Sequence, residues 1–349
     1  MTIVESRPIT GGVDTHLDVH VAAALDAIGG LLGVEEFPTT PAGYKALLNW
    51  LADLGPVARV GVEGTGSYGA RLTRYLQSLG ISVIEVNRAD RQDRRRQGKS
   101  DPLDAISAAR AAQSGRAAAL PKGSDGEVEA IRMLLVAKRS ARRDRTSAIN
   151  QLRGLLAAGP DDLRERLARH GVSALVAETA ALRPRAGDIV EHAARVTLRE
   201  LGRRARSLDE EIVRLDKLIG SLVAARSAGL LGLFGVGPDT AATLLVTAGD
   251  HPERLRSEAA FAQLCGVAPI PASSGKVTRH RLNRAGDRQA NQALWRIAFV
   301  RMGSDPRTYV QRRTAEGKSK AEIMRCLKRY VPARSIPSCA PDAPSLGTA

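Results

Sequence analysis

The chain has 349 residues, of which 43% are hydrophobic, 26% charged and only 3% aromatic. Lys and Arg number 52 against 37 Asp and Glu, and the formal net charge of +15 favours a polyanionic partner such as nucleic acid. The scarcity of aromatic residues disfavours base stacking as the main grip on single strands. No apolar run approaches the roughly 18 residues of a membrane span, the N-terminus lacks a signal-peptide pattern, and the three cysteines form no CxxC pair. We therefore expect no membrane association and a place in the reducing cytoplasm, near the nucleoid.

Residues 12–120 alternate between strand and helix patterns, which indicates an α/β layer architecture. The segment GVDTHLDVHV is predicted to form one strand, with Asp14, His16, Asp18 and His20 on a single face. Further along the chain we expect a strand near 31–37, a helix at 42–54, a strand ending at Glu63, a glycine turn (GTGSYG), a helix at 70–80 and a strand at 81–87. The glycine turn is either a phosphate-binding loop or an ordinary strand-to-helix turn.

Four acidic residues stand out on these elements: Asp14, Glu63, Asp101 and Asp104. Asp101 and Asp104 lie three residues apart, on one face of a predicted helix. Carboxylates that converge from separate elements repel one another, and a hard divalent cation would relieve the repulsion. A metal held in this way next to arginines suits phosphodiester chemistry. Asp101 could also be the helix N-cap, with Pro102 as the first helical residue.

A transition-metal site formed by His16, Asp18 and His20 is a rival interpretation. Ligands at i, i+2 and i+4 of one strand span too far to hold a single ion easily. We expect the two histidines to be satisfied polar residues or substrate contacts instead.

Positive charge is concentrated in two segments. Residues 275–334 contain 16 Lys and Arg against four acidic residues, and residues 88–99 contain six against two. From these segments we predict nucleic-acid contacts by Arg94, Arg95, Arg96, Lys99, Lys276, Arg279, Arg281 and Arg284.

The middle of the chain, residues 125–228, has long helical patterns. Apolar residues recur with 4-3-4-3 spacing between 208 and 222, which predicts a coiled-coil seam of two heptads. The seam could serve dimerisation or an intrachain helical hairpin.

The last third is predicted to be helical, with a glycine-rich loop at 268–287. Gly235 and Gly237 lie in a turn between two helices, which indicates either a DNA-binding helix-hairpin-helix or an ordinary helical hairpin. Ser273 and Ser274 begin a Ser-Ser-Gly turn that enters the basic segment. Ser319 and Glu322 form a capping box for the last helix. The Pro- and Ser-rich residues 335–349 are expected to be disordered.

The segments GVDTH, VEGTGSYG and KSDPLDA, followed by LFGVGPDTAATLL, GVAPIPASSGKVTRHRLNRAGDRQANQAL and RRTAEGKSKAEIMRCLKRY, occur in this order. As an ordered set they resemble the DEDD transposases of the insertion-sequence 110 family, the group that includes its 116 and 902 relatives. The resemblance implies an N-terminal RNase H-like domain, similar to Holliday-junction resolvases. Together with the patterns above it divides the chain into an RNase H-like domain at 10–122, a helical and coiled-coil region at 123–228, a C-terminal helical transposase domain with a helix-hairpin-helix at 229–334, and the tail.

The resemblance also implies roles for individual residues and partners. Asp14, Glu63, Asp101 and Asp104 would hold Mg²⁺, or alternatively Mn²⁺. A C-terminal serine would attack DNA and form a covalent intermediate; it maps to Ser274, with Ser273 as the alternate. The implied partners are double-stranded DNA at the element ends and target, a guide RNA, and further copies of the chain in a dimer or tetramer.

We thus expect a transposase, a site-specific DNA recombinase that excises and inserts an insertion sequence. The alternative enzyme is a metal-dependent junction nuclease that uses water and forms no serine intermediate. A sugar-kinase-like phosphotransferase and a non-catalytic nucleic-acid-binding protein are the remaining alternatives.

Overall fold

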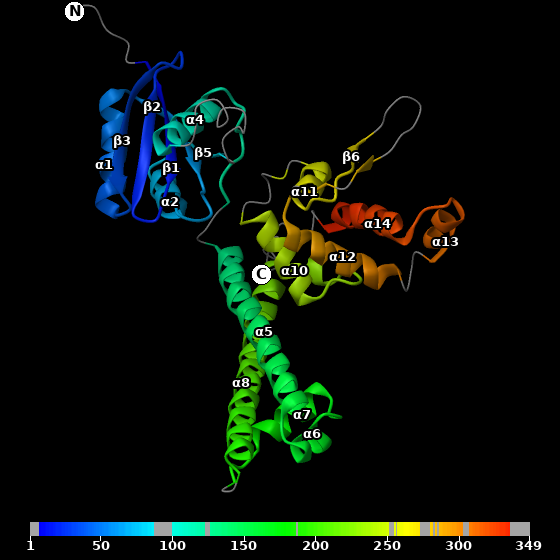
Figure 1. The fold of residues 1–349 in the computed structure, drawn as a ribbon. Helices are drawn as coiled ribbons and strands as arrows, with labels where there is room; N and C mark the ends of the chain where they lie inside the picture. The colour runs from blue at the N-terminus through cyan, green and yellow to red at the C-terminus, as the bar shows by residue number, and fades with distance from the viewer. Residues whose placement is uncertain are drawn as a thin grey trace, which may run out of the picture. The chain divides into compact units, whose positions relative to one another are not determined.

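The computed structural model describes residues 7–86, 100–122, 126–185, 188–250, 255, 257–272, 280–281, 283–284, 286–302 and 307–335. The chain forms two compact units, Met1–Ser124 and Asp125–Ala349, which are described separately (Figure 1). None of the helices within the described ranges is both long and apolar enough to cross a membrane. The predicted tail at 335–349 lies, apart from its first residue, outside the described residues.

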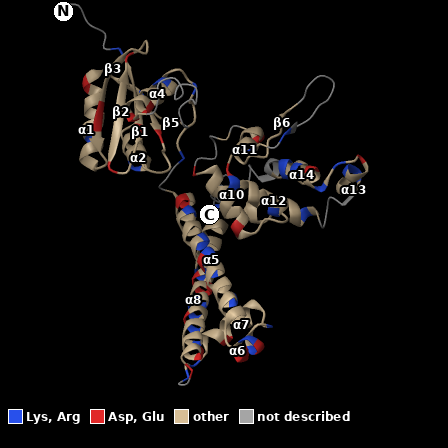
Figure 2. Cartoon of the chain, in the orientation of Figure 1, with Lys and Arg blue, Asp and Glu red and all other residues tan. Residues whose placement is uncertain are grey.

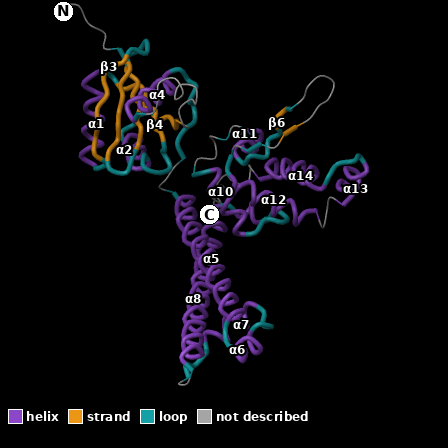
Figure 3. Tube along the Cα trace, in the orientation of Figure 1, coloured by secondary structure: helices purple, strands orange, loops and turns teal. Residues whose placement is uncertain are grey.

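The first unit is a mixed five-stranded sheet with helices on both faces, as the α/β pattern predicts (Figure 3). Its order is β3-β2-β1-β4-β5; β1, β2 and β3 are antiparallel, while β4 and β5 run parallel to β1. The strands are β1 (Ile9–Thr15), β2 (Val19–Leu25), β3 (Leu31–Pro38), β4 (Val57–Glu63) and β5 (Val83–Val86), and the helices are α1 (Pro41–Leu54), α2 (Ala70–Ser78) and α4 (Asp101–Gln113). The main apolar core lies between the sheet and α1 and α2, whereas α4 covers the other face.

The prediction of one long strand over GVDTHLDVHV is wrong, because the segment forms the β1–β2 hairpin. Asp14 pairs with Val21 and Thr15 pairs with His20 across the hairpin. The three residues between the strands are polar or exposed and carry no glycine or proline, so they continue the alternating pattern and hide the turn. As a result His20 lies on the opposite face of the sheet from Asp14, and the two do not share a face as predicted.

His20 is fully buried on the α1 side of the sheet. Its ring stacks on Tyr44 with 5.8 Å between ring centroids, and neither ring nitrogen has a hydrogen-bond partner within the described structure. Burial, with a smaller contribution from the charge of His16, lowers the pKa of His20 from 6.5 to about 4. The folded protein therefore holds this imidazole neutral.

We expect His20 to make the protein less stable in mild acid. Between pH 6.5 and about 4 a proton binds this imidazole in the unfolded chain only, so its contribution to stability is complete above pH 6.5 and is lost as the pH falls toward 4. From pH 7 to pH 5 the free energy of unfolding should fall by about 2 kcal/mol because of this residue. Chemical denaturation of wild type and His20→Leu at both pH values measures the difference; parallel pH profiles for the two proteins would contradict the assignment.

The second unit begins with a long helical hairpin. It consists of α5 (Glu127–Ala158), α6 (Asp161–Leu167), α7 (Val172–Ala180) and α8 (Ile189–Arg226). The heptad seam lies on α8, where Ile219 is buried in the same cluster as Ile131 and Leu135 of α5. Of the two predicted uses of the seam, the structure thus has the intrachain helical hairpin.

The remaining elements form a helical body around the end of this hairpin. They are α9 (Ala228–Leu231), α10 (Pro238–Ala248), α11 (Glu258–Leu264), β6 (Ile270–Pro271), β7 (His280–Arg281), α12 (Arg288–Met302), α13 (Arg307–Ala315) and α14 (Lys320–Ser335). The predicted glycine loop at 268–287 contains the two short strands β6 and β7, which pair antiparallel and which the sequence did not indicate. The predicted capping box is confirmed: Ser319 N donates to Glu322 Oε2 at 2.9 Å, and Glu322 N donates to Ser319 Oγ at 3.4 Å.

A buried ion network joins α5, α8 and α10. Lys138 is only 2% exposed, and its ammonium group contacts the carboxylates of Asp216 and Asp239. Arg142 Nη1 also reaches Asp239, at 3.0 Å. Burial raises the pKa of Asp239, but Lys138 and Arg142 outweigh it and hold the pKa of this carboxyl below its usual value. The network fixes the start of α10 against the helical hairpin.

Replacing Lys138 by Met should destabilise the protein by about 3 kcal/mol, because two partly buried carboxylates lose their cation. This loss of stability should lie near the lower end of the range for broken buried ion pairs, because both carboxylates are partly exposed to water. Adding Asp216→Asn and Asp239→Asn should restore part of the loss in chemical denaturation. The exposed Lys217→Met is the matched control and should change stability by less than about 0.5 kcal/mol. A loss that the two amide substitutions leave unchanged would mean that the charges are not what stabilises this junction.

Candidate metal centre

Helix α4 lies directly on the backbone of the sheet. A methyl group added at Gly12 of β1 would come within 2.2 Å of Ala109 N and 2.3 Å of Ala105 O, and one added at Gly61 of β4 would lie 2.6 Å from Ala108 O. The facing side of α4 is lined by alanines, which are fully or almost fully buried. Small residues on both sides therefore allow this close approach, and the approach determines where the start of α4 lies.

Asp14 and Glu63 lie at the carboxyl ends of two neighbouring parallel strands. Val13 pairs with Val62, so one further step in the register places Asp14 beside Glu63. Both residues are two positions from a glycine that contacts α4, so their side chains leave the sheet on the α4 face. Thr15 Oγ1 donates to Glu63 O at 2.8 Å and links the two strand ends. The predicted position of Glu63 at a strand end is confirmed.

Helix α4 brings two more carboxylates to this edge of the sheet. Asp101 is its first residue and Asp104 its fourth, while Ser100 is the N-cap, so the prediction of Asp101 as N-cap is wrong by one position. The backbone N–H of Asp104 donates to Ser100 O at 3.1 Å, and the Asp104 side chain is buried. The Asp101 side chain is half exposed. Both carboxylates favour the positive end of the helix dipole.

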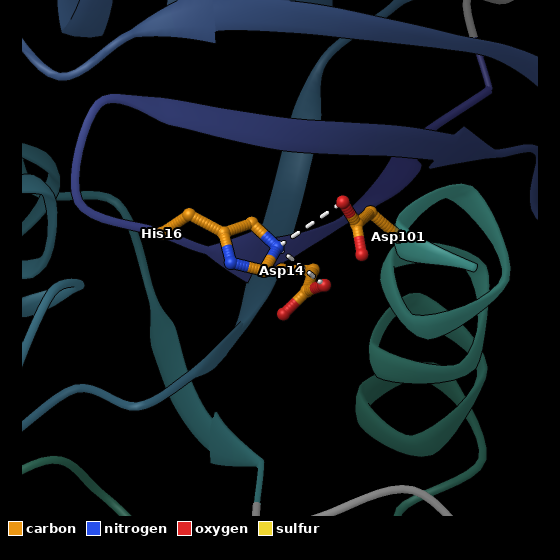
Figure 4. A group of neighbouring side chains, drawn as sticks. All are labelled: Asp14, His16 and Asp101. Carbon is orange, nitrogen blue, oxygen red and sulfur yellow. Dashed lines mark hydrogen bonds and ion pairs between the residues drawn. The ribbon is translucent and has the colours of Figure 1, made fainter. Parts of the chain in front are cut away.

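His16 joins the acidic group, as Figure 4 shows. Its Nε2 lies 3.2 Å from Asp14 Oδ2 and 3.5 Å from Asp101 Oδ2. One ligand atom each from Asp14, His16 and Asp101 lies within 4.8 Å of the other two, which is close enough for all three to share an ion. The prediction that His16 is a satisfied polar residue is confirmed by its contact with Asp14; its place beside Asp101 was not predicted. The rival transition-metal interpretation also named His16, but together with Asp18 and His20, which do not belong to this group.

The electrostatics of Asp14 show that the carboxylates converge. Burial raises the pKa of Asp14 above its usual value; the neighbouring His16 opposes this, while the charges of Asp104 and Asp101 raise the pKa further. Three carboxylates thus lie within electrostatic range of one another on a partly desolvated edge. Oxygen donors in this arrangement are those that Mg²⁺ and Mn²⁺ prefer, and a divalent cation would relieve the repulsion. The residues present therefore fit such an ion.

The glycine turn after Glu63 closes on itself. The backbone N–H groups of Ser67 and Gly69 both donate to Gly64 O, at 2.9 and 3.2 Å. Gly64 has a φ of +72°, which favours glycine. Because these amides are used within the turn, the ordinary strand-to-helix turn describes this loop better than a phosphate-binding loop.

Most of the predicted nucleic-acid contacts lie outside the described residues. These are Arg94, Arg95, Arg96, Lys99, Lys276 and Arg279, together with both candidate nucleophiles, Ser273 and Ser274. Arg281 ends β7 and Arg284 follows it, and both are exposed.

The Gly235–Gly237 turn connects α9 and α10, as predicted. Gly235 has a φ of +80° and packs against α12, with Ile297 O 3.3 Å from the position of an added methyl group. Gly237 is the N-cap of α10 and has open space around it, although its N–H donates to Thr240 Oγ1 at 3.0 Å. Gly237 is thus exposed to solvent, whereas Gly235 is packed against α12.

Two comparisons of the sequence identify related proteins. Residues 11–159 match a family of the DEDD IS110 type, described as "Transposase", and residues 228–311 match the "Transposase IS116/IS110/IS902 family". A 43.6 kDa protein of insertion element IS110 from Streptomyces coelicolor is 36% identical over 128 residues, which are 35% of this chain and 31% of that protein. A 42 kDa protein of insertion element IS900 from Mycobacterium paratuberculosis is 28% identical over 134 residues, 37% of this chain and 34% of that protein. Each match spans about a third of the relative's length.

Gly12→Ala should disrupt the candidate metal centre without changing any ligand. The added methyl group would clash with the backbone of α4, cost about 3 kcal/mol or more, and push Asp101 and Asp104 away from Asp14. Mn²⁺ binding, followed by electron paramagnetic resonance, should weaken at least about tenfold. Gly11→Ala is the matched control, because the nearest neighbours of the methyl group would be the Leu51 and Val60 side chains on the other face, and Mn²⁺ affinity should be retained. Equal Mn²⁺ affinity in the two variants would show that the close packing of α4 on the sheet does not assemble the site.

Proposed function

The chain belongs to the IS116/IS110/IS902 family of transposases, and we propose that it is itself a transposase, an enzyme that cuts and rejoins DNA at the ends of an insertion element. The observation that carries the proposal is the convergence of Asp14, Asp101 and Asp104 beside Glu63, on the α4 face of the sheet. A cluster of carboxylates in a chain with a net charge of +15 suits a site where a metal ion meets a nucleic-acid backbone.

Asp14, Glu63, Asp101 and Asp104 would hold Mg²⁺, with Mn²⁺ as an alternative. When bound, such an ion polarises a phosphoryl oxygen and stabilises the charge that develops as the phosphodiester breaks. The chain's own contribution is to fix the carboxylates at strand ends and at the start of a helix, which are rigid elements. Carboxylates held in this way orient the scissile phosphate. The mixed sheet with helices on both faces supports an RNase H-like assignment for this unit.

The proposed nucleophile is Ser274, with Ser273 as the alternate. The serine Oγ would form a new ester bond to phosphorus while one P–O bond of the DNA backbone breaks. The hydroxyl proton passes to a base and the departing DNA oxygen takes up a proton, so the cut strand stays attached to the protein. Attack by a DNA hydroxyl on this ester then rejoins the strands and frees the serine. The neighbouring Lys276, Arg279 and Arg281 supply positive charge for the transition state.

The proposed partners are double-stranded DNA at the element ends and at the target, a guide RNA that pairs with both, and further copies of this chain in a dimer or tetramer. The surplus of Lys and Arg in α12, α13 and α14 supports a nucleic-acid partner (Figure 2). The competing enzyme is a junction nuclease that uses the same carboxylates to activate water and forms no bond between protein and DNA.

Asp14→Asn, Glu63→Gln and Asp104→Asn should each lower excision of an element with its natural ends at least about a hundredfold, because each removes a charge that the ion needs. Asp18→Asn is the matched control on the same hairpin, since Asp18 is exposed and outside the cluster, and it should excise normally. Thermal denaturation checks that each variant folds. Full activity of Asp14→Asn and Glu63→Gln would refute the metal centre.

Trapping on DNA tests the nucleophile in the same system. Ser274→Ala should abolish the covalent protein–DNA adduct, and Ser273→Ala should do so only if the alternate position is correct. Strand cleavage that survives in the double variant, with no adduct, would favour the junction nuclease.

A further inference from the structure

The outer face of α12 carries aromatic side chains where a surface helix normally has polar ones. Its inner face, with Ala290, Leu294 and Ile297, is buried in the apolar cluster that also contains residues of α10 and α14. On the opposite face Trp295 is 43% exposed and Phe299 is 59% exposed. The two rings stack on each other, with centroids 5.2 Å apart and planes 19° apart. The two stacked rings form an exposed apolar platform in a chain whose aromatic content is only 3%.

The surroundings of this platform are cationic. Arg288 and Arg296 are exposed on the same side of α12, and the helix contains no acidic residue. A self-complementary contact between two copies would place these arginines near their own symmetry mates, which is unfavourable. Charge therefore argues against a second copy of this chain and for a polyanion.

An open cavity of about 450 Å³ lies between α12 and the start of α10. Its lining includes Gly237, Arg142, Arg296 and Val300, of which Arg296 and Val300 belong to α12. The cavity also contains the carboxylates of Asp216 and Asp239, but Lys138 contacts both and Arg142 pairs with Asp239. Arg296 is thus both an exposed cation of α12 and part of the cavity wall.

We propose that Trp295 and Phe299 are a stacking platform for unpaired bases of a nucleic acid, whose phosphates are held by Arg288 and Arg296. This inference rests on the proposed nucleic-acid function and adds to it a preference for single-stranded segments. Bases inside a duplex cannot reach an aromatic face, whereas splayed bases stack on one regardless of their sequence. The shared ligand chemistry is an unpaired base with its phosphate, which either a loop of RNA or a melted DNA strand could supply.

The chain offers a built-in reporter, because its only tryptophans are Trp50 and Trp295. Trp50 is in α1 of the first unit, next to Phe37, so Trp50→Phe keeps an aromatic ring there and leaves Trp295 as the sole emitter. The full-length Trp50→Phe protein is titrated with an unstructured 12-nucleotide RNA, the same DNA single strand, and the duplex DNA. Stacking should quench Trp295 with single strands and leave it nearly unchanged with saturating duplex. The strand type that quenches at the lower concentration identifies the preferred source.

Affinity measurements complete the test. Trp295→Ala and Phe299→Ala should each weaken single-strand binding about fivefold or more, with little change for duplex, and Trp295→Phe should retain most of the affinity. Ile28→Ala, a highly exposed apolar side chain in the first unit, is the matched control and should bind like wild type. The platform is refuted if Trp295 stays unquenched by single strands, if both ligands lose affinity equally, or if the variants instead change the oligomer mass, which would make this face a contact between copies. Absence of binding to any of the three nucleic acids would instead refute the proposed function itself.

Discussion

The candidate metal centre depends on one contact, the packing of α4 directly on the backbone of β1 and β4. Gly12 and Gly61 contribute no side chain between α4 and the sheet, and the small alanines of α4 keep the distance short. This contact carries Asp101 and Asp104 to the edge where Asp14 and Glu63 leave the sheet. Interiors are close-packed, so a single added methyl group cannot be absorbed locally and must move the helix.

The net charge of the chain is positive, whereas the side chains of the candidate metal centre are mainly acidic. The chain as a whole is strongly basic, yet Asp14 lies among other carboxylates on a partly desolvated edge, where its pKa is raised. Long-range attraction to a polyanion and short-range repulsion among carboxylates are reconciled if a divalent cation binds between the carboxylates and the phosphates. In the second unit a side chain takes the place of a metal cation, because the buried Lys138 neutralises the carboxylates of Asp216 and Asp239 directly.

Much of the fold could be predicted from the sequence, because period-2 and period-3.6 patterns and capping residues are local. They correctly predicted the strand that ends at Glu63, the helix at 42–54 and the capping box at Ser319. The β1–β2 turn was missed, since its residues continue the strand alternation without a turn signal. The position of His16 beside Asp101 and the close packing of α4 on the sheet were not predictable either. Both depend on contacts between elements, and a glycine in a strand signals a bulge as readily as a close approach. The aromatic platform of α12 was hidden for the same reason: composition counts aromatic residues but not which of them stay exposed.

A crystal structure of the protein soaked with Mn²⁺ tests the central claim most directly, because the anomalous signal locates the ion independently of any assay of activity. We predict an anomalous peak with an oxygen of Asp14 and an oxygen from the start of α4 about 2.0–2.6 Å away, with Glu63 as a further ligand or bound through water. Full Mn²⁺ occupancy elsewhere, with Asp14 and Asp101 making no contact to an ion, would contradict a metal centre at this edge of the sheet.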